Sequence, residues 1–307
     1  MHGFHGIVES VKSIWRPLEP GEPIGVVALS GPVDPAKLEA GLTVLRDWGH
    51  PVIEAANLRA EQGYLAGSDS ERLAGLEEVL GAGVRWIVAA RGGFGCTRLL
   101  PSVSLDRLRE REVSLIGYSD LTAFLNPLAQ NGGAVQIHGP MAAAGLTRPH
   151  NANRLRALLT GELSGGVLFR FPEGAVARSG RAVGPALGGN LTLVTALLGT
   201  PWEPDFDGCV LFLEEVGEPL YRLDRMLTHL RGSGKLRNVK ALIGGSLRGC
   251  GPVSDRSDGW RRMLVEAAPA EVPVVVGLPF GHGAANLAFP IGAIVDIDTD
   301  RRRITWS

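Results

Sequence analysis

Residues 24–34 have the sequence IGVVALSGPVD, and this stretch decides the fold class. Residues 24–29 are a continuous apolar run of strand length, which is typical of a strand buried on both faces of a parallel sheet. The turn that follows ends in Asp34, which can N-cap a helix, and Pro35 suits the first helical position. Leucines then recur at helical spacing, so the stretch predicts a strand–turn–helix unit.

The same alternation continues along the N-terminal half. Apolar runs of strand length recur at residues 84–90 (VRWIVAA), 113–117 (VSLIG) and 135–138 (VQIH). Helical patterns lie between them, and one of these begins at Ser68, where Glu71 completes a capping box. Strands that alternate with helices indicate an α/β fold with a parallel sheet, in which ligands bind beyond the carboxyl ends of the strands. We therefore expect a site near the loops RGGFG, GYSD and HGPM.

The length of 307 residues predicts two domains, because single cores usually split beyond about 250 residues. We assign residues 16–146 to an N-terminal domain, 147–180 to a crossover and 181–307 to a second, β-rich α/β domain. The second domain has its own strand-like runs, at residues 210–213, 239–243, 272–276, 294–297 and 304–306.

The composition excludes several classes of protein. The net charge is −1, so no cationic field would attract nucleic acid. No apolar run approaches ~18 residues, so we expect no membrane span and no membrane partner. The N-terminus has no basic region followed by an apolar one, so we expect no signal peptide. The three cysteines are too sparse for a disulfide framework or a zinc site, which favours a reducing, cytoplasmic location.

Glycine is the unusual residue, with 42 occurrences in 307 positions, twice the average of ~7%. The glycines follow no collagen period and gather at the ends of the strand-like runs. Residues 91–95 (RGGFG) are one example. They lack the Lys-Ser/Thr of a P-loop and do not match G-x-G-x-x-G, so backbone N–H donation to an oxyanion is a better use. The alternative is a simple turn.

Ser119 is the candidate nucleophile. It follows an apolar strand and precedes a helix, where a sharp turn exposes the hydroxyl and the helix N-terminus offers backbone N–H groups to an oxyanion. The sequence is GYSD rather than G-x-S-x-G, so the pattern of α/β-hydrolases is not met. The alternative is that Ser119 or Asp120 only caps the helix, as both residue types do at such turns.

A serine nucleophile needs a base, which in turn needs an orienting carboxylate. His138 and His282 both lie in glycine-flanked loops after strands. Gly281 and Gly283 have no side chains that could shield His282 from a substrate. The alternatives are a solvated loop histidine at His282 and a buried, hydrogen-bonded structural histidine at His138.

Carboxylates cluster in residues 213–218 (LEEVGE). By strand alternation Glu214 continues the core-facing row of the preceding apolar run, and a charge there must be paired or functional. Glu215 points the other way. Glu215 and Glu218 could equally face solvent or pair with arginines of the following helix.

Several segments together resemble the LD-carboxypeptidases, the serine peptidase family that includes the murein tetrapeptide carboxypeptidases and the microcin C self-immunity peptidases. The resemblance runs from about Leu18 to Ile297. The matching segments are PLEPGEPIGVVALSGP, AARGGFG, LIGYSDLTAF, IHGPM, GGNLTLVTALLGTP, LFLEEVGEPLYRLDRMLTHLRGSG and GLPFGHGAANLAFPIGA. Each is weak alone, but in this order the set is specific.

The resemblance implies a catalytic triad of Ser119, Glu214 and His282. It also implies an oxyanion hole formed by backbone N–H groups of Gly93, or its neighbour, and of Asp120. The implied fold is a flavodoxin-like parallel-sheet N-terminal domain with a smaller, swivelling β-rich C-terminal domain. The site would lie at the interface of the two domains, usually in a homodimer.

The sequence departs from the family pattern in three places. Glu214-Glu215 replaces the common Glu-Asp pair and keeps the charge. ALSGP, around Ser30, replaces the more usual APSxP. The first ~15 residues extend beyond the usual start of the family.

The resemblance implies a small peptide substrate, a murein tetrapeptide, from which cleavage of an L,D bond releases the terminal D-alanine during peptidoglycan recycling. Arg91 and Gly92 would contact the substrate, with Arg91 facing its α-carboxylate. A surface ion pair is the alternative for Arg91. No HExxH motif or His/Asp cluster supports a metal enzyme, so we expect no metal and no cofactor.

Two other functions stay open. A self-immunity peptidase would hydrolyse a microcin C-like aminoacyl-nucleotide and would need an aromatic loop to stack the base. Residues 165–180 contain Phe169 and Phe171 but no tryptophan. A non-catalytic ligand-binding protein on the same fold is the alternative of another class.

Overall fold

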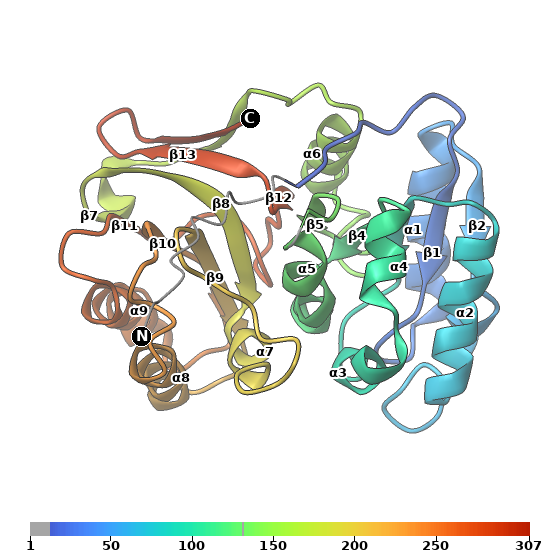
Figure 1. Cartoon of the computed structure of the whole chain (residues 1–307), viewed down its shortest axis with the longest axis horizontal. Coiled ribbons are helices and arrows are strands. Elements are labelled where there is room, and N and C mark those ends of the chain that lie inside the picture. The colour runs from blue at the N-terminus through green and yellow to red at the C-terminus, as the bar shows by residue number, and fades with distance from the viewer. Residues whose placement is uncertain (1–12, 131) are drawn as a thin grey trace, which may run out of the picture.

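Two β-sheets lie next to each other and organise the chain (Figure 1). The computed structural model describes residues 13–130 and 132–307. The prediction that the N-terminus is no signal peptide concerns mainly residues 1–12, and these lie outside the described residues.

Within residues 13–130 and 132–307, the first sheet has six strands, and five of them are parallel. Their order, β2-β1-β3-β4-β5, is that of flavodoxin-like folds, so this expectation is confirmed. The apolar runs of β1, β3 and β4 are buried throughout, as strands covered on both faces must be. The strands, in sheet order, are β12 (Phe289–Ile291), β5 (Gln136–His138), β4 (Ser114–Gly117), β3 (Trp86–Ala89), β1 (Ile24–Val27) and β2 (Val52–Glu54).

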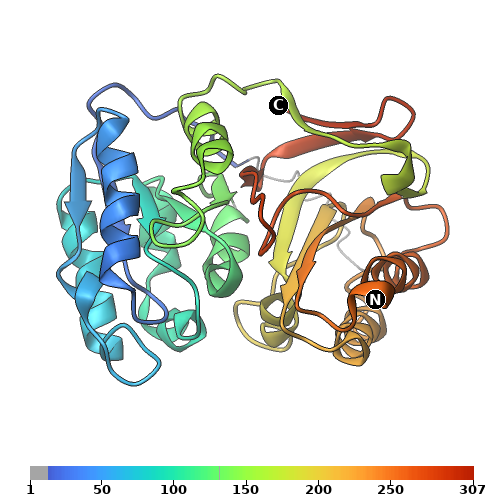
Figure 2. The ribbon, with the colours of Figure 1, turned by 180° about the vertical axis from the view of Figure 1, so that it is seen from behind.

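Helices cover both faces of this sheet. α1 (Pro35–Asp47) and α6 (Pro149–Leu159) lie on the face toward the viewer in Figure 2. The helices on the opposite face are α2 (Asp69–Gly81), α4 (Leu105–Glu110) and α5 (Thr122–Ala129), with the short α3 (Cys96–Leu99) below them in Figure 1.

The predicted helix starts are confirmed. Asp34 caps α1 by accepting from the backbone N–H of Ala36 at 2.9 Å. Ser68 and Glu71 form the capping box of α2. These local signals need no tertiary context, because the cap and its donors lie within three residues of each other.

The second sheet has eight strands in the described part of the chain. Its central strands β8 to β11 are parallel and its flanking strands are antiparallel. The strands, in sheet order, are β6 (Val167–Arg170), β14 (Arg303–Trp306), β13 (Ile294–Asp298), β8 (Arg181–Asn190), β9 (Val210–Val216), β10 (Ala241–Arg248), β11 (Val274–Val275) and β7 (Val176–Arg178). Its helices are α7 (Leu191–Ala196), α8 (Leu220–Gly232) and α9 (Val253–Ala267).

The segment 147–180, which we interpret as a crossover, contributes to both halves. It supplies α6 to the first sheet and the two edge strands, β6 and β7, to the second. The chain also returns from the second sheet to the first, where β12 pairs antiparallel with β5 and places Phe289 opposite His138.

Buried polar contacts join the two sheets. Asn126 of α5 donates from Nδ2 to the carbonyl of Gly188 at 3.0 Å and accepts from the Gly188 N–H at 2.7 Å. The Thr122 hydroxyl accepts from the Asn190 N–H at 3.1 Å. These hydrogen bonds therefore connect the helix α5, which follows β4 in the chain, to the end of β8.

Candidate active site

Ser119 lies in a strained turn at the end of β4. It begins the single 3₁₀ turn Ser119–Leu121 and has a φ of 62°, in the left-handed region that non-glycine residues rarely adopt. Such strain costs of order 1–3 kcal/mol and is typical of nucleophile elbows. Neither Ser119 nor Asp120 caps α5 through its side chain, so the capping alternative is wrong.

The glycine loop after β3 packs directly against this serine. A Cβ atom on Gly92 would lie 2.9 Å from Ser119 Cβ and 3.0 Å from Ser119 Oγ, so only glycine fits there. Gly93 has a φ of 138°, and its N–H donates to no backbone carbonyl of the described residues. The loop is therefore more than a simple turn, because the backbone of Gly92 packs against the Ser119 side chain.

Glu214 and His282 form a hydrogen-bonded pair on the second sheet. Nδ1 of His282 lies 2.7 Å from Oε2 of Glu214, which also accepts from the His282 backbone N–H at 3.2 Å. The Glu214 side chain is fully buried and that of His282 is 13% exposed, so the solvated-loop alternative is wrong. Gly281 is required because a Cβ there would overlap the Glu214 carboxylate.

Tyr118 connects the two halves of the site. Its ring contacts the His282 ring edge-on, with centroids 4.8 Å apart, and Ser119 is the next residue in the chain. Within the described residues, no hydrogen bond joins the Ser119 hydroxyl to His282. The structure thus brings the three expected residues into one region and pairs two of them.

A cavity of about 610 Å³ opens beside this region. It is lined by Tyr118 and His282 and by two arginines that sequence reasoning missed, Arg148 and Arg248. Arg148 donates to the carbonyl of Gly283 at 3.2 Å. Arg248 ends strand β10, and a position at a strand end beside the site is the signal that could have identified it.

Arg91 does not form the surface ion pair we considered. Its side chain is exposed and donates to the backbone carbonyls of Pro32 at 2.9 Å and Gly92 at 3.1 Å. No carboxylate among the described residues pairs with it. The Arg91 guanidinium therefore links the glycine loop to the loop after β1 and stays accessible to solvent.

His138 is buried but not hydrogen-bonded. Its ring stacks on Phe289 with centroids 4.9 Å apart and lies 5.9 Å from the ring of Tyr118. Neither ring nitrogen has a partner among the described residues. Burial lowers the pKa of His138 to about 4, so this ring is neutral at pH 7. Unlike His282, it has no carboxylate partner to orient it among the described residues.

The other two carboxylates of the cluster have structural partners. Glu215 is buried and accepts from Asn190 Nδ2 at 2.7 Å and from the Thr192 N–H at 2.8 Å, so a solvent-facing Glu215 is wrong. Burial raises its pKa. Glu218 pairs with Arg222 at 3.1 Å, as the alternative for that residue predicted.

Two domain models of one family match the chain. The LD-carboxypeptidase N-terminal domain matches residues 24–139, and the LD-carboxypeptidase C-terminal domain matches residues 183–297. The chain belongs to the LD-carboxypeptidase family. The triad residues expected from the resemblance fall inside the two matched ranges, Ser119 in the first and both Glu214 and His282 in the second.

Relatives of this LD-carboxypeptidase cover nearly its full length. A probable murein peptide carboxypeptidase of Bacillus subtilis is 34% identical over 92% of this chain and 91% of its own. The murein tetrapeptide carboxypeptidase of Pseudomonas aeruginosa is 33% identical over 94% of this chain and 96% of its own. A structure of MccF in complex with glutamyl sulfamoyl guanosine has the same fold, with a TM-score of 0.86, 22% identity and coverage of 97% and 98% of the two chains.

Three further features of this LD-carboxypeptidase concern metal ligands, membrane-spanning helices and cysteines. In the described ranges, no three His, Cys, Asp or Glu side chains gather as a metal site. No helix of that part of the chain has the length and apolar character needed to cross a membrane. Cys96, Cys209 and Cys250 are all buried and free.

Proposed function

We propose that this chain cleaves the L,D-peptide bond of a murein tetrapeptide and releases its terminal D-alanine in peptidoglycan recycling. Ser119 is the nucleophile, His282 the base and Glu214 the carboxylate that orients the base. The observation that supports this best is the buried Glu214–His282 hydrogen bond of 2.7 Å, whose histidine contacts Tyr118, the residue before a serine in a strained turn. The Bacillus and Pseudomonas relatives, named for murein peptides, support the substrate class.

In the first step the Ser119 hydroxyl attacks the carbonyl carbon of the scissile bond. Because Nδ1 of His282 is bonded to Glu214, Nε2 is the ring nitrogen that takes the serine proton. His282 then gives this proton to the amine of D-alanine, the C–N bond breaks, and an acyl-enzyme remains on Ser119. Water, deprotonated by His282, attacks the ester, and the proton returns to the serine oxygen.

Backbone N–H groups of Gly93 and Asp120 stabilise the oxyanion in both steps. Gly93 supports this role because its N–H has no backbone acceptor among the described residues and its loop touches Ser119. Asp120 follows the nucleophile at the start of a helical segment, where the N–H groups are not yet paired. Removing one such donor typically lowers kcat by about 10²–10³-fold.

The substrate's α-carboxylate requires a cation. Arg91, with Gly92 beside it, is the candidate from sequence, and its exposed guanidinium lies next to the glycine loop. Arg148 and Arg248 offer further positive charge because they line the cavity that His282 also lines. The substrate's α-carboxylate could therefore bind at either of two ends of the site, the glycine loop with Arg91 or the cavity with Arg148 and Arg248.

The direct test is the release of D-alanine from purified murein tetrapeptide by the full-length chain. A matched peptide that ends in L-alanine is the control for stereochemistry. We expect release from the first peptide only, and loss of that release in Ser119→Ala. The wild-type chain leaving the tetrapeptide intact would refute the proposed substrate.

Self-immunity against an aminoacyl-nucleotide is the second candidate, because MccF has the same fold. A base must be stacked on an exposed aromatic ring, and the sequence offered Phe169 and Phe171 for this. Both are buried in the core, at 2% and 7% exposure, so neither is available. Hydrolysis of glutamyl sulfamoyl guanosine faster than of the tetrapeptide would reverse this ranking.

A non-catalytic binding protein is tested with an aryl phosphonate, which labels an activated serine. We expect labelling at Ser119 and nowhere else.

We also propose a cytoplasmic location, which the three free cysteines support, and a homodimer. The mass in solution, measured by light scattering, tests the dimer.

A further inference from the structure

The carboxylate of Asp120, the residue that follows the proposed nucleophile, is buried. The residue is 1% exposed. Its Oδ2 atom accepts a hydrogen bond from the Ser30 hydroxyl at 2.6 Å and another from the Cys96 backbone N–H at 2.9 Å. Its Oδ1 atom has no partner among the described residues.

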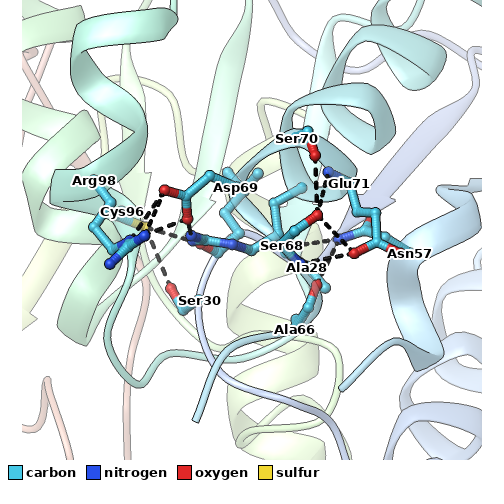
Figure 3. A network of polar contacts seen from close by, with 12 residues as sticks. Ala28, Ser30, Asn57, Ala66, Ser68, Asp69, Ser70, Glu71, Cys96 and Arg98 are labelled. Carbon is cyan, nitrogen blue, oxygen red and sulfur yellow. Dashed lines mark hydrogen bonds and ion pairs between the residues drawn. The ribbon is translucent and has the colours of Figure 1, made fainter. Parts of the chain in front are cut away.

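These two bonds connect three strand-end loops. Asp120 follows β4, Ser30 follows β1, and Cys96 begins α3 at the end of the glycine loop after β3. Figure 3 shows Ser30 and Cys96 side by side, with Oγ and Sγ 3.2 Å apart. The Gly31 N–H also donates to the Gly92 carbonyl at 3.3 Å, so contacts at both Ser30 and Gly31 join the β1 loop to the glycine loop.

A buried carboxylate without a cationic partner is costly. No salt bridge to Asp120 exists among the described residues, and burial raises its pKa. Its side chain does not cap the helix, although capping is the usual reason for an aspartate in this position. What the carboxylate does contribute is a link between the residue after Ser119 and the loop of Gly93.

We propose that the Asp120 carboxylate is a positioning residue that fixes the oxyanion hole, by holding the glycine loop against the nucleophile turn through Cys96 and the β1 loop through Ser30. This inference rests on the proposed function, because it takes Ser119 as the nucleophile. The two oxyanion donors, Gly93 N–H and Asp120 N–H, lie on different loops. Their separation has to be held within a fraction of an ångström, and the Asp120 side chain spans those loops.

Asp120→Ala removes the acceptor for both bonds and is the main test. We expect kcat for D-alanine release to fall by about 10²-fold while KM changes less than about threefold, because the oxyanion exists only in the transition state. Asp120→Asn keeps an acceptor oxygen of the same shape and should recover most of the lost activity, to within about tenfold of wild type. Ser30→Ala removes one of the two bonds and should fall between these variants.

A second measurement does not depend on the peptide. The rate at which an aryl phosphonate labels Ser119 also requires the oxyanion hole, so it should fall in Asp120→Ala in parallel with kcat. Asp298→Asn is the matched control, since Asp298 is a buried carboxylate of β13 that also accepts from a backbone N–H, that of Arg301 at 3.0 Å. This variant should leave both rates unchanged.

The outcomes separate the inference from the proposed function. If the wild-type chain is labelled at Ser119 but releases no D-alanine, the substrate proposal fails and the labelling rates still decide the role of Asp120. If Ser119 is not labelled in the wild type, both proposals are overturned. If Asp120→Ala and Ser30→Ala both label Ser119 at the wild-type rate, the positioning role is refuted, and where Asp120→Ala does not fold, the wild-type rate in Ser30→Ala alone refutes it. A loss of kcat in Asp120→Ala matched by an equal rise in KM would also refute it.

Discussion

His282 and Glu214 lie on the second sheet and are joined at 2.7 Å, whereas Ser119 lies on the first sheet and has no hydrogen bond to His282 among the described residues. In the proposed acid–base half, the Glu214 carboxylate is fully buried and accepts two hydrogen bonds from His282. The nucleophile half is held by backbone strain and by close packing of glycine. In the proposed mechanism, catalysis therefore depends on the relative position of these two halves.

The contacts between the sheets show what holds that position. Asn126 and Thr122 on α5 bond the end of β8, and β8 pairs with β9, the strand of Glu214. The helix that begins just after Ser119 is thus linked to the strand of Glu214 by short, buried bonds. The following predictions test each half against the other.

Removing each half's key side chain should have the largest effect. Ser119→Ala is expected to lower kcat by about 10⁴–10⁶-fold, because no other side chain replaces the nucleophile. Glu214→Gln is expected to lower kcat by about 10²–10⁴-fold, since the histidine keeps its position but loses its ionic partner. Single-turnover kinetics on the tetrapeptide measure both.

The double variant gives the contrast between the halves. If the three residues act as one unit, Ser119→Ala combined with Glu214→Gln should be no slower than Ser119→Ala alone. Additive losses would show that the two halves do not act on the same step. Circular dichroism spectra and thermal unfolding of each variant check that the fold is intact.

Gly92→Ala perturbs the nucleophile half alone. The new Cβ would sit 2.9 Å from Ser119 Cβ, so the serine must move by some tenths of an ångström. We expect kcat to fall by about 10–100-fold. Gly174→Ala is the control, because a Cβ there meets nothing within 4 Å. Equal activity of the two variants would show that the glycine loop does not confine Ser119.

How much of this was visible in the sequence differs between the halves. The turn after β4 was predicted because a buried apolar run next to GYSD is a local signal, and Glu214 was singled out by strand alternation. The burial of Glu215 was left open because its partners, Asn190 and Thr192, lie 25 and 23 residues away on other elements. The link from Asp120 to Ser30, 90 residues apart, was likewise invisible to spacing.

Strands with poor local signals were missed for a similar reason. β8 contains Gly184, Pro185, Gly188 and Gly189, which argue against a strand when neighbours are unknown. The glycines are needed because side chains at Gly184 and Gly188 would strike the backbone of neighbouring strands or loops. Tertiary packing, rather than propensity, thus determines this strand.

Arg248 and Arg91, at the two ends of the proposed site, differ in the hydrogen bonds that their guanidinium groups already make. Arg248 lines the cavity and has no carboxylate partner among the described residues, whereas Arg91 already donates to two carbonyls of loops. We expect Arg248→Ala to raise KM about tenfold and Arg91→Ala to raise it about threefold, with kcat little changed in both. Initial rates over a range of tetrapeptide concentrations separate the two constants. A larger rise in Arg91→Ala would place the substrate carboxylate at the glycine loop.

The buried ring of His138, which lies between the halves, affects stability rather than turnover. His138 has a pKa of about 4 in the folded chain and ordinarily 6.5, so the unfolded state binds more protons between these values. The free energy of unfolding should therefore fall as the pH drops from 6.5 to 4, by up to about 3 kcal/mol from this residue.

His138→Phe removes the titrating nitrogens and keeps a ring against Phe289, so its urea midpoint should fall less over this pH range than that of the wild type. His229→Gln, on α8, is the control and should retain the wild-type pH dependence. A wild-type pH dependence in His138→Phe would mean that other groups, such as the carboxylates, account for the acid sensitivity.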